Sequence, residues 1–351
     1  MKTGCHFRPQ YAIIYGMKFS FCIPVYNGEG HLEAAIRRLQ SQEFSDWEAV
    51  VVDDGSTDGT PALADAIAAA DSRVRTVHQP NAGVAAARNR ALDEARGDWI
   101  AWLDADDAYV DGALSRMAGL VDSHPGCNCL HFPYLEARPG AEPARRVDAA
   151  HASADGNEMC GAAAFDLLYA NRETAGINWQ PWRHVYRRDS LPRFRAGKIH
   201  EDVDVLPLHL AGLDRVCIVG EPFYVYTPAR EGSLTGAFSP KRVWDILEAT
   251  GHVYGCMESS ALAPEARRGF ASLLAVNLFG YYLATPSFGE PDRSRLLDAF
   301  AEHPEWLTAI DWPRKTGWLK RLAVRVLGVR GAAKTIYALK TLAGRGRGAR
   351  R

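Results

Sequence analysis

The residues Trp99-Ile-Ala-Trp-Leu-Asp-Ala-Asp-Asp107 join an uninterrupted apolar run to a cluster of three carboxylates. An unbroken apolar run of this length is typical of a strand that is buried on both faces of a parallel sheet. In open α/β sheets, ligands bind just beyond the carboxyl ends of such strands. The run therefore predicts a buried strand over 99–103 with a polar site directly after it.

Similar strands alternate with helices on both sides of this run. We predict strands over 18–25, 48–52, 73–78 and 129–135, and helices over 32–39, 60–70, 82–95 and 114–121. This alternation predicts a Rossmann-like α/β fold, in which helices flank a mostly parallel central sheet. Residues 161–230 add helices and short strands, and 241–310 form a helical extension. The apolar stretch 270–283 is interpreted as a buried helix, because it is too short to span a membrane.

Polar clusters follow three of the predicted strands, at 26–27, 53–54 and 104–107. The carboxyl ends of parallel strands meet at one edge of a sheet, so we expect these clusters to converge on one crevice. The cluster at 53–54 continues through Ser56, Asp58 and Thr60, which suit a tight turn and a helix cap. Asp54 is the residue of this segment that we expect to accept hydrogen bonds from a ligand.

Asp104 and Asp106 alternate after a strand and can point at one position. Carboxylate oxygens are the ligands that Mg²⁺ and Mn²⁺ prefer, and two carboxylates leave coordination positions for substrate phosphates. These two residues therefore predict a site for Mn²⁺ or Mg²⁺ that also holds a diphosphate. Asp107 and Asp111, by contrast, are interpreted as caps of the next helix.

Four motifs together resemble one known family. They are Pro24-Val-Tyr-Asn27, Asp53 to Thr60, Asn81-Ala-Gly83 with Ala86-Ala-Arg-Asn89, and Trp102-Leu-Asp-Ala-Asp-Asp107. Their order and spacing resemble the inverting family 2 glycosyltransferases, which have a GT-A fold. The resemblance is strong over 18–135 and weaker up to about 235. Each motif alone is a weak signal, but four in order are specific.

The resemblance implies a nucleotide-sugar donor, with a UDP-sugar favoured. Its binding residues would be Pro24, Val25, Tyr26, Asn27, Asp54, Arg88, Asp104 and Ala105. The first three would line the base pocket, Asp54 would bind the base edge, and Arg88 would hold the nucleotide or diphosphate. A solvated helix face is the alternative for Arg88. Asp106 would ligate the metal, and Asp104 would contact the metal or the ribose.

Later motifs resemble the acceptor half of the same family. Asp202 would take the proton of the acceptor hydroxyl, and Glu201 would share that step or orient the acceptor. An acidic helix cap is the alternative for this pair. Trp182 would form the floor of the acceptor site or belong to the core. Arg230 and Ser233 would close over the diphosphate or form a charged loop.

Charge is distributed unevenly along the chain. Up to Pro313 there are 29 Lys and Arg against 42 Asp and Glu, whereas the rest holds 12 Lys and Arg and no acidic residue. Apolar and basic residues mix at helical spacing over 318–327 and 336–342. This pattern predicts an amphipathic helix that binds an anionic membrane surface, which would suit a lipid-linked acceptor. A helix packed on the body is the alternative. No base-stacking motif accompanies the charge, so we expect no nucleic-acid partner.

We expect an extension over 1–17, a catalytic domain over 18–235, a helical region over 236–313 and a basic tail over 314–351. The catalytic domain would divide into a donor half at 18–135 and an acceptor half at 136–235. Within it, 138–160 are interpreted as a loop or lid. Translation starting at Met17 and a short N-terminal arm are equal alternatives for the extension. The scattered cysteines and the absence of a secretory pattern predict reduced thiols in the cytoplasm, with the tail at the inner face of the membrane.

The function that we expect is inverting sugar transfer to a hydroxyl of a glycan or lipid-linked acceptor, in cell-surface polysaccharide synthesis. One alternative is a catalytically inactive module that binds nucleotide sugars or glycans. The presence of Asp54, Asp104, Asp106 and Asp202 together argues against it. Another is a nucleotidyltransferase, which would need a cationic glycine-rich loop where this chain has Asn27-Gly-Glu-Gly30.

Overall fold

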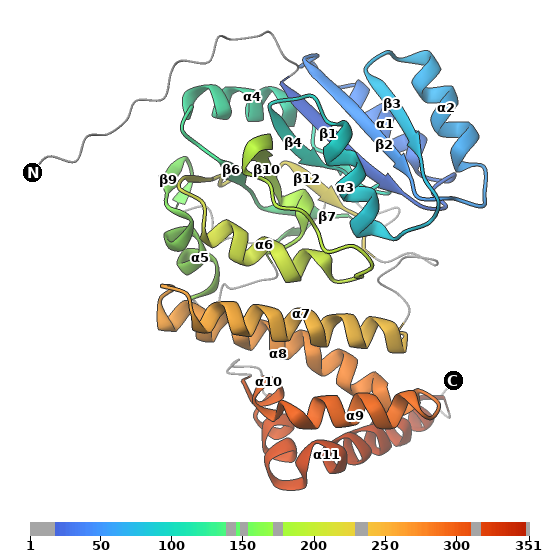
Figure 1. Ribbon diagram of the computed structural model, residues 1–351, viewed down its shortest axis with the longest axis vertical. Helices are drawn as coiled ribbons and strands as arrows, with labels where there is room; N and C mark the ends of the chain where they lie inside the picture. The colour runs from blue at the N-terminus through green and yellow to red at the C-terminus, as the bar shows by residue number, and fades with distance from the viewer. Residues whose placement is uncertain are drawn as a thin grey trace, which may run out of the picture.

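The computed structural model describes residues 18–137, 145–147, 154–170, 178–228, 238–309 and 317–348. The sheets and the C-terminal helices form successive layers along the long axis of the molecule (Figure 1). The expected extension over 1–17, most of the expected lid, Arg230 and Ser233 lie outside the described residues.

The main sheet has eight strands in the order β3-β2-β1-β4-β10-β6-β11-β9. In chain order these are β1 (Phe19–Val25), β2 (Trp47–Asp53), β3 (Val74–His78), β4 (Trp99–Trp102), β6 (Cys129–His131), β9 (Asn157–Met159), β10 (His184–Arg187) and β11 (Val216–Ile218). The first four are parallel, and β10 runs antiparallel to both of its neighbours. The predicted α/β fold with a mostly parallel central sheet is therefore confirmed.

A second sheet of four strands lies beside the first. Its order is β5 (Ala108–Tyr109), β12 (Tyr224–Tyr226), β7 (Tyr134–Glu136) and β8 (Arg145–Val147). The prediction of one strand over 129–135 is wrong, because β6 and β7 belong to different sheets. Pro133 lies between them, and proline has no N–H group to donate to a continuous ladder.

Helices flank these sheets: α1 (Leu32–Gln40), α2 (Thr60–Ala70), α3 (Val84–Glu94), α4 (Ala113–Ser123), α5 (Gly161–Tyr169) and α6 (Glu201–Ala211). The prediction that Asp107 or Asp111 caps α4 is wrong. The residue that precedes the helix is Gly112, and no side chain caps it. Gly112 has a φ of 74°, a conformation that glycine adopts without steric cost.

A buried polar network joins the strands at the amino end of the main sheet. Glu48 on β2 accepts hydrogen bonds from the Ser20 hydroxyl and from the Arg96 backbone N–H, both at 2.6 Å. The Arg75 guanidinium lies 3.1 Å from its other oxygen. Burial alone would raise the pKa of Glu48, but the hydrogen bonds from Ser20, Arg96 and Arg75 hold it below its usual range. The network thereby fixes β1, β2 and β3 at the end opposite the polar clusters.

The chain continues into α7 (Pro240–Glu258), α8 (Pro264–Ala284), α9 (Asp292–Glu302), α10 (Pro304–Thr308) and α11 (Gly317–Gly348). Helix α7 packs on α6, and α8 packs on α5 and α7 (Figure 1). The predicted helical extension and its buried helix over 270–283 are confirmed, since α8 buries twelve of its residues. No helix in the described part of the chain is long and apolar enough to cross a membrane.

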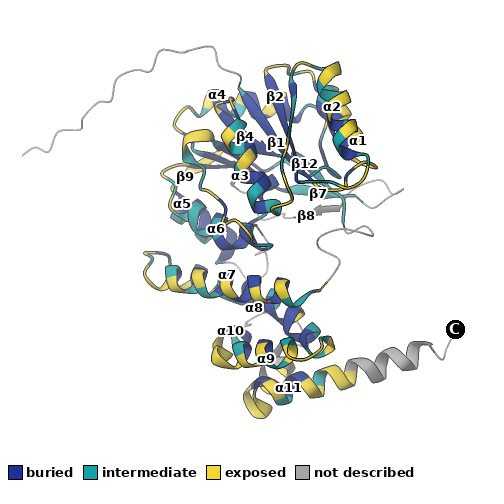
Figure 2. Ribbon diagram, turned by 45° about the vertical axis from the view of Figure 1, so that its right-hand side comes forward, coloured by how far each residue is buried: buried dark blue, intermediate teal, exposed yellow. Residues whose placement is uncertain are grey.

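The last helix, α11, kinks at Gly328 and shows both apolar contact and apolar exposure. Val324, Val329, Ala332 and Ala333 are buried against the body. The Tyr282 hydroxyl of α8 donates to the Val329 carbonyl. Figure 2 shows exposed stretches along α11. The exposed apolar side chains of the helix include Leu319, Leu322, Val326, Leu327 and Leu339. The packed helix expected as an alternative is therefore present, and it leaves an apolar face uncovered.

Candidate active site

The strand ends that carry the polar clusters meet at one edge of the main sheet. The Asp54 N–H donates to the Val25 carbonyl at 2.9 Å, and the Leu103 N–H donates to the Cys22 carbonyl at 3.1 Å. The ends of β1, β2 and β4 are thus hydrogen-bonded neighbours. The strand ends therefore meet at one edge of the sheet as predicted, and the convergence of the clusters on one crevice stays a prediction.

The turn after β1 is held by hydrogen bonds with the loop after β2, and it presents an aromatic ring to solvent. Asn27 accepts a hydrogen bond from the Thr57 N–H through its side chain, and its own N–H donates to the Ser56 hydroxyl, both at 2.8 Å. Tyr26 is 47% exposed, whereas Val25 is buried. The turn therefore holds a free aromatic face at the sheet edge, where the base pocket was predicted.

Asp54 organises the loop that leads into α3. Its carboxylate accepts hydrogen bonds from the Gln79 amide at 2.7 Å, the Ala82 N–H at 2.9 Å and the Gly83 N–H at 2.8 Å. Both oxygens are engaged, and the residue is 4% exposed. The described geometry therefore gives Asp54 a loop-shaping role, and its contact with a base stays a prediction.

Arg88 of α3 links the two halves of the site. Its guanidinium is ion-paired with Glu201 and lies 3.5 Å from an Asp104 carboxylate oxygen. The rings of Trp102 and Phe194 lie within 6 Å of it. The residue is 6% exposed, so the solvated helix face considered for Arg88 is wrong. The cation instead holds carboxylates from β4 and α6 close to one another.

Glu201 and Asp202 form the first turn of α6, after His200. Glu201 is buried, while Asp202 is partly exposed and one of its oxygens accepts a hydrogen bond from the Val203 N–H at 2.7 Å. Burial raises the pKa of both carboxyl groups, and the Arg88 charge opposes that rise. An acidic first turn suits the helix dipole, as the alternative interpretation required. The raised pKa also makes the Asp202 carboxylate a better proton acceptor.

Tyr224 orders the carboxylates after β4. No motif of the sequence predicted this role. Its hydroxyl accepts a hydrogen bond from the Asp104 N–H at 3.1 Å and donates to Asp107 at 2.9 Å. Asp107 also accepts from the Thr227 N–H at 2.7 Å. Burial and the charges of Asp104 and Asp106 raise the pKa of Asp107 to about 8. Asp107 therefore links the segment after β4 to the smaller sheet. Ala105 is half-buried and stands between Asp104 and Asp106 in the chain.

Asp104 and Asp106 are the residues here that could hold a divalent cation. In the described ranges, no group of three or more His, Cys, Asp or Glu side chains could hold a metal ion by itself. Burial raises the pKa of Asp104, the nearby charge of Asp106 adds to the rise, and Arg88 opposes it. A divalent cation would relieve this repulsion. The donor set thus fits a hard cation that receives its other oxygen ligands from a substrate.

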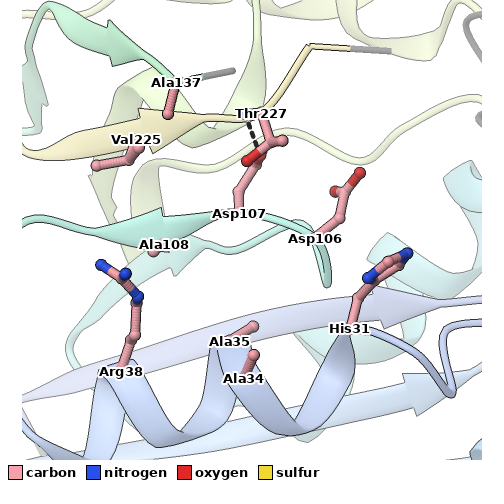
Figure 3. Close-up of a pocket in the computed structure, with 10 residues that line it drawn as sticks. All are labelled: His31, Ala34, Ala35, Arg38, Asp106, Asp107, Ala108, Ala137, Val225 and Thr227. Carbon is pink, nitrogen blue, oxygen red and sulfur yellow. Dashed lines mark hydrogen bonds between the residues drawn. The ribbon is translucent and has the colours of Figure 1, made fainter. Parts of the chain in front are cut away.

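A pocket of about 210 Å³ opens beside these carboxylates (Figure 3). Asp106 and Asp107 lie on one side of it, and Arg38 of α1 and His31, the residue before α1, lie on the other. Ala34 and Ala35 leave room between them. No sequence motif marked His31 or Arg38, and their separation of seven positions, about two helical turns, is the signal that could have paired them.

Trp182 lies in an aromatic cluster of the smaller sheet. Its ring stacks on Tyr224 at 4.6 Å and on Tyr226 at 5.4 Å, and Tyr134 meets its edge at 4.8 Å. The side chain is 4% exposed, which is the position that the core alternative gave it. Its contact with an acceptor sugar stays a prediction.

Residues 20–146 match the family model described as glycosyl transferase family 2. This region of the chain belongs to that family. The matched residues contain β1 to β7 and every carboxylate of the donor side, from Asp54 to Asp107. The resemblance to family 2 inferred from the four sequence motifs is therefore confirmed over this region.

Curated relatives support this membership over longer and shorter stretches. The uncharacterized glycosyltransferase EpsJ of Bacillus subtilis is 29% identical over 217 residues, which cover 59% of this chain and 60% of EpsJ. The GalNAc(5)-diNAcBac-PP-undecaprenol beta-1,3-glucosyltransferase of Campylobacter jejuni is 34% identical over 118 residues, 32% of this chain and 38% of that protein. The family 2 chain thus spans 60% or less of the length of these relatives.

Among solved structures, S. aureus TarS 1-349 in complex with UDP-GlcNAc is similar to the family 2 chain. The TM-score is 0.64 and the identity is 18%, over 93% of this chain and 92% of that one. At this identity the likeness shows the fold, and the GT-A fold that the sequence implied is confirmed. The likeness also extends through the C-terminal helices, beyond the residues that the family model matches.

Proposed function

We propose that this chain is an inverting, metal-dependent glycosyltransferase. It transfers a sugar from a nucleotide diphosphate sugar to a hydroxyl of a glycan or a lipid-linked acceptor, in cell-surface polysaccharide synthesis. The observation that carries the proposal is the position of Arg88, which joins the donor-side carboxylate Asp104 to the first turn of α6. A carboxylate pair next to a diphosphate site is the arrangement that an inverting transfer needs.

Each half of the site has a distinct task in this reaction. On the donor side, Tyr26 offers a ring to the base, while Asp104 and Asp106 face the diphosphate. A divalent cation bound by these two carboxylates would supply charge neutralisation for the leaving diphosphate. Arg88 adds a fixed positive charge at the same place.

On the acceptor side, Asp202 accepts the proton of the acceptor hydroxyl as that oxygen attacks the sugar. Its partial exposure gives it access to an acceptor, and its raised pKa favours proton transfer. Glu201 is buried and ion-paired with Arg88, so it positions the pair. Attack from the face opposite the diphosphate inverts the configuration at the sugar carbon.

The first test is release of nucleoside diphosphate from a panel of nucleotide sugars in the presence of Mn²⁺. UDP-GlcNAc is the donor to try first, because a solved structure of similar fold is in complex with it. We expect Asp202→Asn to lower turnover by about 10²–10⁴-fold while donor binding remains. Asp111→Asn, an exposed carboxylate near the same edge, is the matched control and should keep full turnover. Donor binding without turnover in the unaltered protein would favour the inactive binding module.

The uncovered face of α11 supports a place for this reaction at an anionic membrane surface. Leu322, Val326 and Leu327 are exposed on a helix that belongs to the basic, acid-free end of the chain. Apolar side chains flanked by basic ones are typical of helices that lie in the membrane interface. Such a location would bring the site to a lipid-linked acceptor.

A further inference from the structure

A second pocket, of about 290 Å³, lies between α7, α9 and α10, away from the candidate active site. It is lined by Trp244 and Glu248 of α7, Glu302 of α9, Trp306 of α10, and His303 between the last two helices. Pockets that bind small molecules combine aromatic walls with a few placed polar groups. This pocket has both.

The aromatic walls of the pocket are fixed by packing. Trp306 is buried and stacks on the His303 ring, with centroids 4.0 Å apart and planes 5° from parallel. Gly251 of α7 leaves room for it, because a Cβ there would lie 3.2 Å from the Trp306 ring. Trp244 is 40% exposed, which is unusual for so large an apolar side chain. The pocket therefore combines an exposed tryptophan with a packed aromatic pair.

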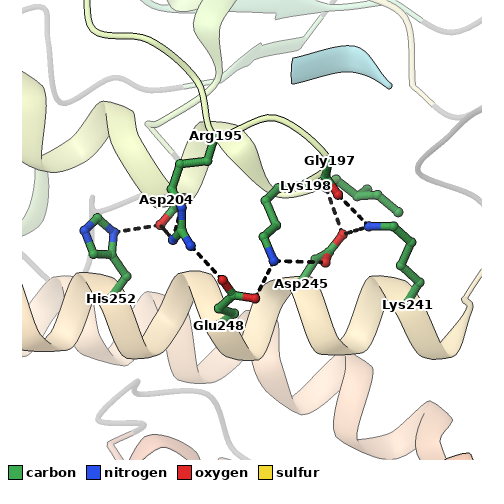
Figure 4. Close-up of polar contacts among 9 residues, drawn as sticks. Arg195, Gly197, Lys198, Asp204, Lys241, Asp245, Glu248 and His252 are labelled. Atoms are coloured by element: carbon green, nitrogen blue, oxygen red, sulfur yellow. Dashed lines mark hydrogen bonds and ion pairs between the residues drawn. The ribbon is translucent and has the colours of Figure 1, made fainter. Parts of the chain in front are cut away.

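The two carboxylates of the pocket differ in their surroundings. Glu248 receives hydrogen bonds from Arg195 at 2.6 Å and from Lys198 (Figure 4). Its hydrogen bond from Lys198 holds the pKa of Glu248 below its usual range. Glu302 is exposed and forms no hydrogen bond or ion pair with another described residue. Glu248 is therefore a fixed acceptor whose charge is compensated, and Glu302 is an adaptable one.

We propose that this pocket binds a sugar unit of the acceptor glycan, outside the catalytic centre. A pyranose ring has an apolar C–H face that suits the Trp244 ring, and hydroxyl groups that donate to Glu302 and Glu248. A cationic ligand fits less well, because Arg195 and Lys198 already compensate Glu248. That the ligand is an acceptor sugar rests on the proposed function, but the pocket is separate from the catalytic centre.

The pocket is connected to the active site through the polar contacts of α7. Lys198 also lies 3.8 Å from Asp245 (Figure 4). Asp245 accepts a hydrogen bond from the Ile199 N–H at 3.1 Å. Ile199 stands two residues before Glu201 in the chain. A glycan held at Glu248 would thus lie next to Lys198, in the segment that leads into the first turn of α6.

Saturation-transfer NMR with methyl β-glucoside and methyl N-acetyl-β-glucosaminide tests the proposal on the full chain. The background variant is Asp202→Asn, so that no transfer occurs. We expect saturable binding that Trp244→Ala weakens by about tenfold and that Glu302→Gln also weakens. Tyr337→Ala, another exposed aromatic residue on a C-terminal helix, is the matched control and should leave binding unchanged.

Two results would overturn the proposal: binding of the glycosides that Trp244→Ala does not alter, or binding of tetramethylammonium in place of the glycosides. Circular dichroism of Trp244→Ala and Glu302→Gln checks that both variants are folded. Turnover of a nucleotide sugar without Trp244-dependent glycoside binding defeats this inference alone. Trp244-dependent binding in a protein that turns over no nucleotide sugar supports the pocket and defeats the proposed function.

Discussion

Arg88 of α3 and Glu201 of α6 form a buried ion pair across 113 positions of the chain. The pair joins α3, which follows the loop held by Asp54, to the first turn of α6. Two opposite charges in a dry environment depend on one another, because either one alone would be desolvated without compensation. Folding and chemistry therefore share this contact.

Replacing Arg88 with methionine should destabilise the protein by about 3–5 kcal/mol, because Glu201 is left as an unpaired buried charge. Turnover of the donor should be lost as well. The double variant Arg88→Met with Glu201→Met should regain much of the stability and none of the activity. Urea unfolding and nucleotide release measure the two effects. A double variant as unstable as Arg88→Met would contradict the pairing argument.

Removal of divalent cations should abolish donor turnover, and added Mn²⁺ should restore it. Asp106→Asn should require much more Mn²⁺ for the same rate, with an unchanged free energy of unfolding. Asp107→Ala should instead lower the free energy of unfolding by about 1–3 kcal/mol, because it leaves the buried Tyr224 hydroxyl and Thr227 N–H without their acceptor. If Asp106→Asn and Asp107→Ala need the same concentration of Mn²⁺ for turnover, the assignment of metal binding to Asp106 and of a structural role to Asp107 is wrong.

His78 should make stability depend on pH. Hydrogen bonds to Asp53 and Asp65 raise the pKa of His78 above its ordinary value of 6.5. A raised pKa means that the stabilisation is complete below 6.5 and is lost as the pH rises through the folded-state pKa. The ring is 42% exposed, so solvent screening limits the effect to below about 1 kcal/mol. The difference in unfolding free energy between the wild type and His78→Gln should be larger at about pH 6 than at about pH 9.

The exposed face of α11 should bind anionic vesicles. The full chain should float with phosphatidylglycerol vesicles and not with phosphatidylcholine vesicles, and Val326→Asp should reduce that binding. Ala301→Asp on α9 adds the same charge at another exposed position and serves as the control. If the full chain fails to float with anionic vesicles, α11 is only a packing helix.

The sequence predicts an element correctly where the residues of that element mark its own ends. The predicted strand ending at Val25 and the helix over 60–70 agree with β1 and α2, since apolar runs and turn residues mark their ends. The smaller sheet was not predicted, because its strands are short and pair across large separations, as Tyr224 does with Tyr109. Pro133 was the one local signal that could have divided β6 from β7.

The residues of the candidate site are also predicted from the sequence only in part. The sequence marked Asp104, Asp106 and Asp202 by residue type and position, but the partners of these residues come from distant elements. Asp107 was interpreted as a cap because its true contacts, Tyr224 and Thr227, lie about 120 positions further on. Contacts of this kind follow from tertiary packing, which a single sequence does not display.

The Glu48 network at the amino end of the main sheet has a consequence for how this chain tolerates change. Its members bind β1, β2 and β3 together a full strand length away from the carboxylates after β4. Substitutions at Ser20, Glu48 or Arg75 should therefore reduce the amount of folded protein in a cell while each surviving molecule keeps its turnover rate. Asp106→Asn at the opposite end should do the reverse, so abundance and catalytic rate can be altered separately at these two places in the fold.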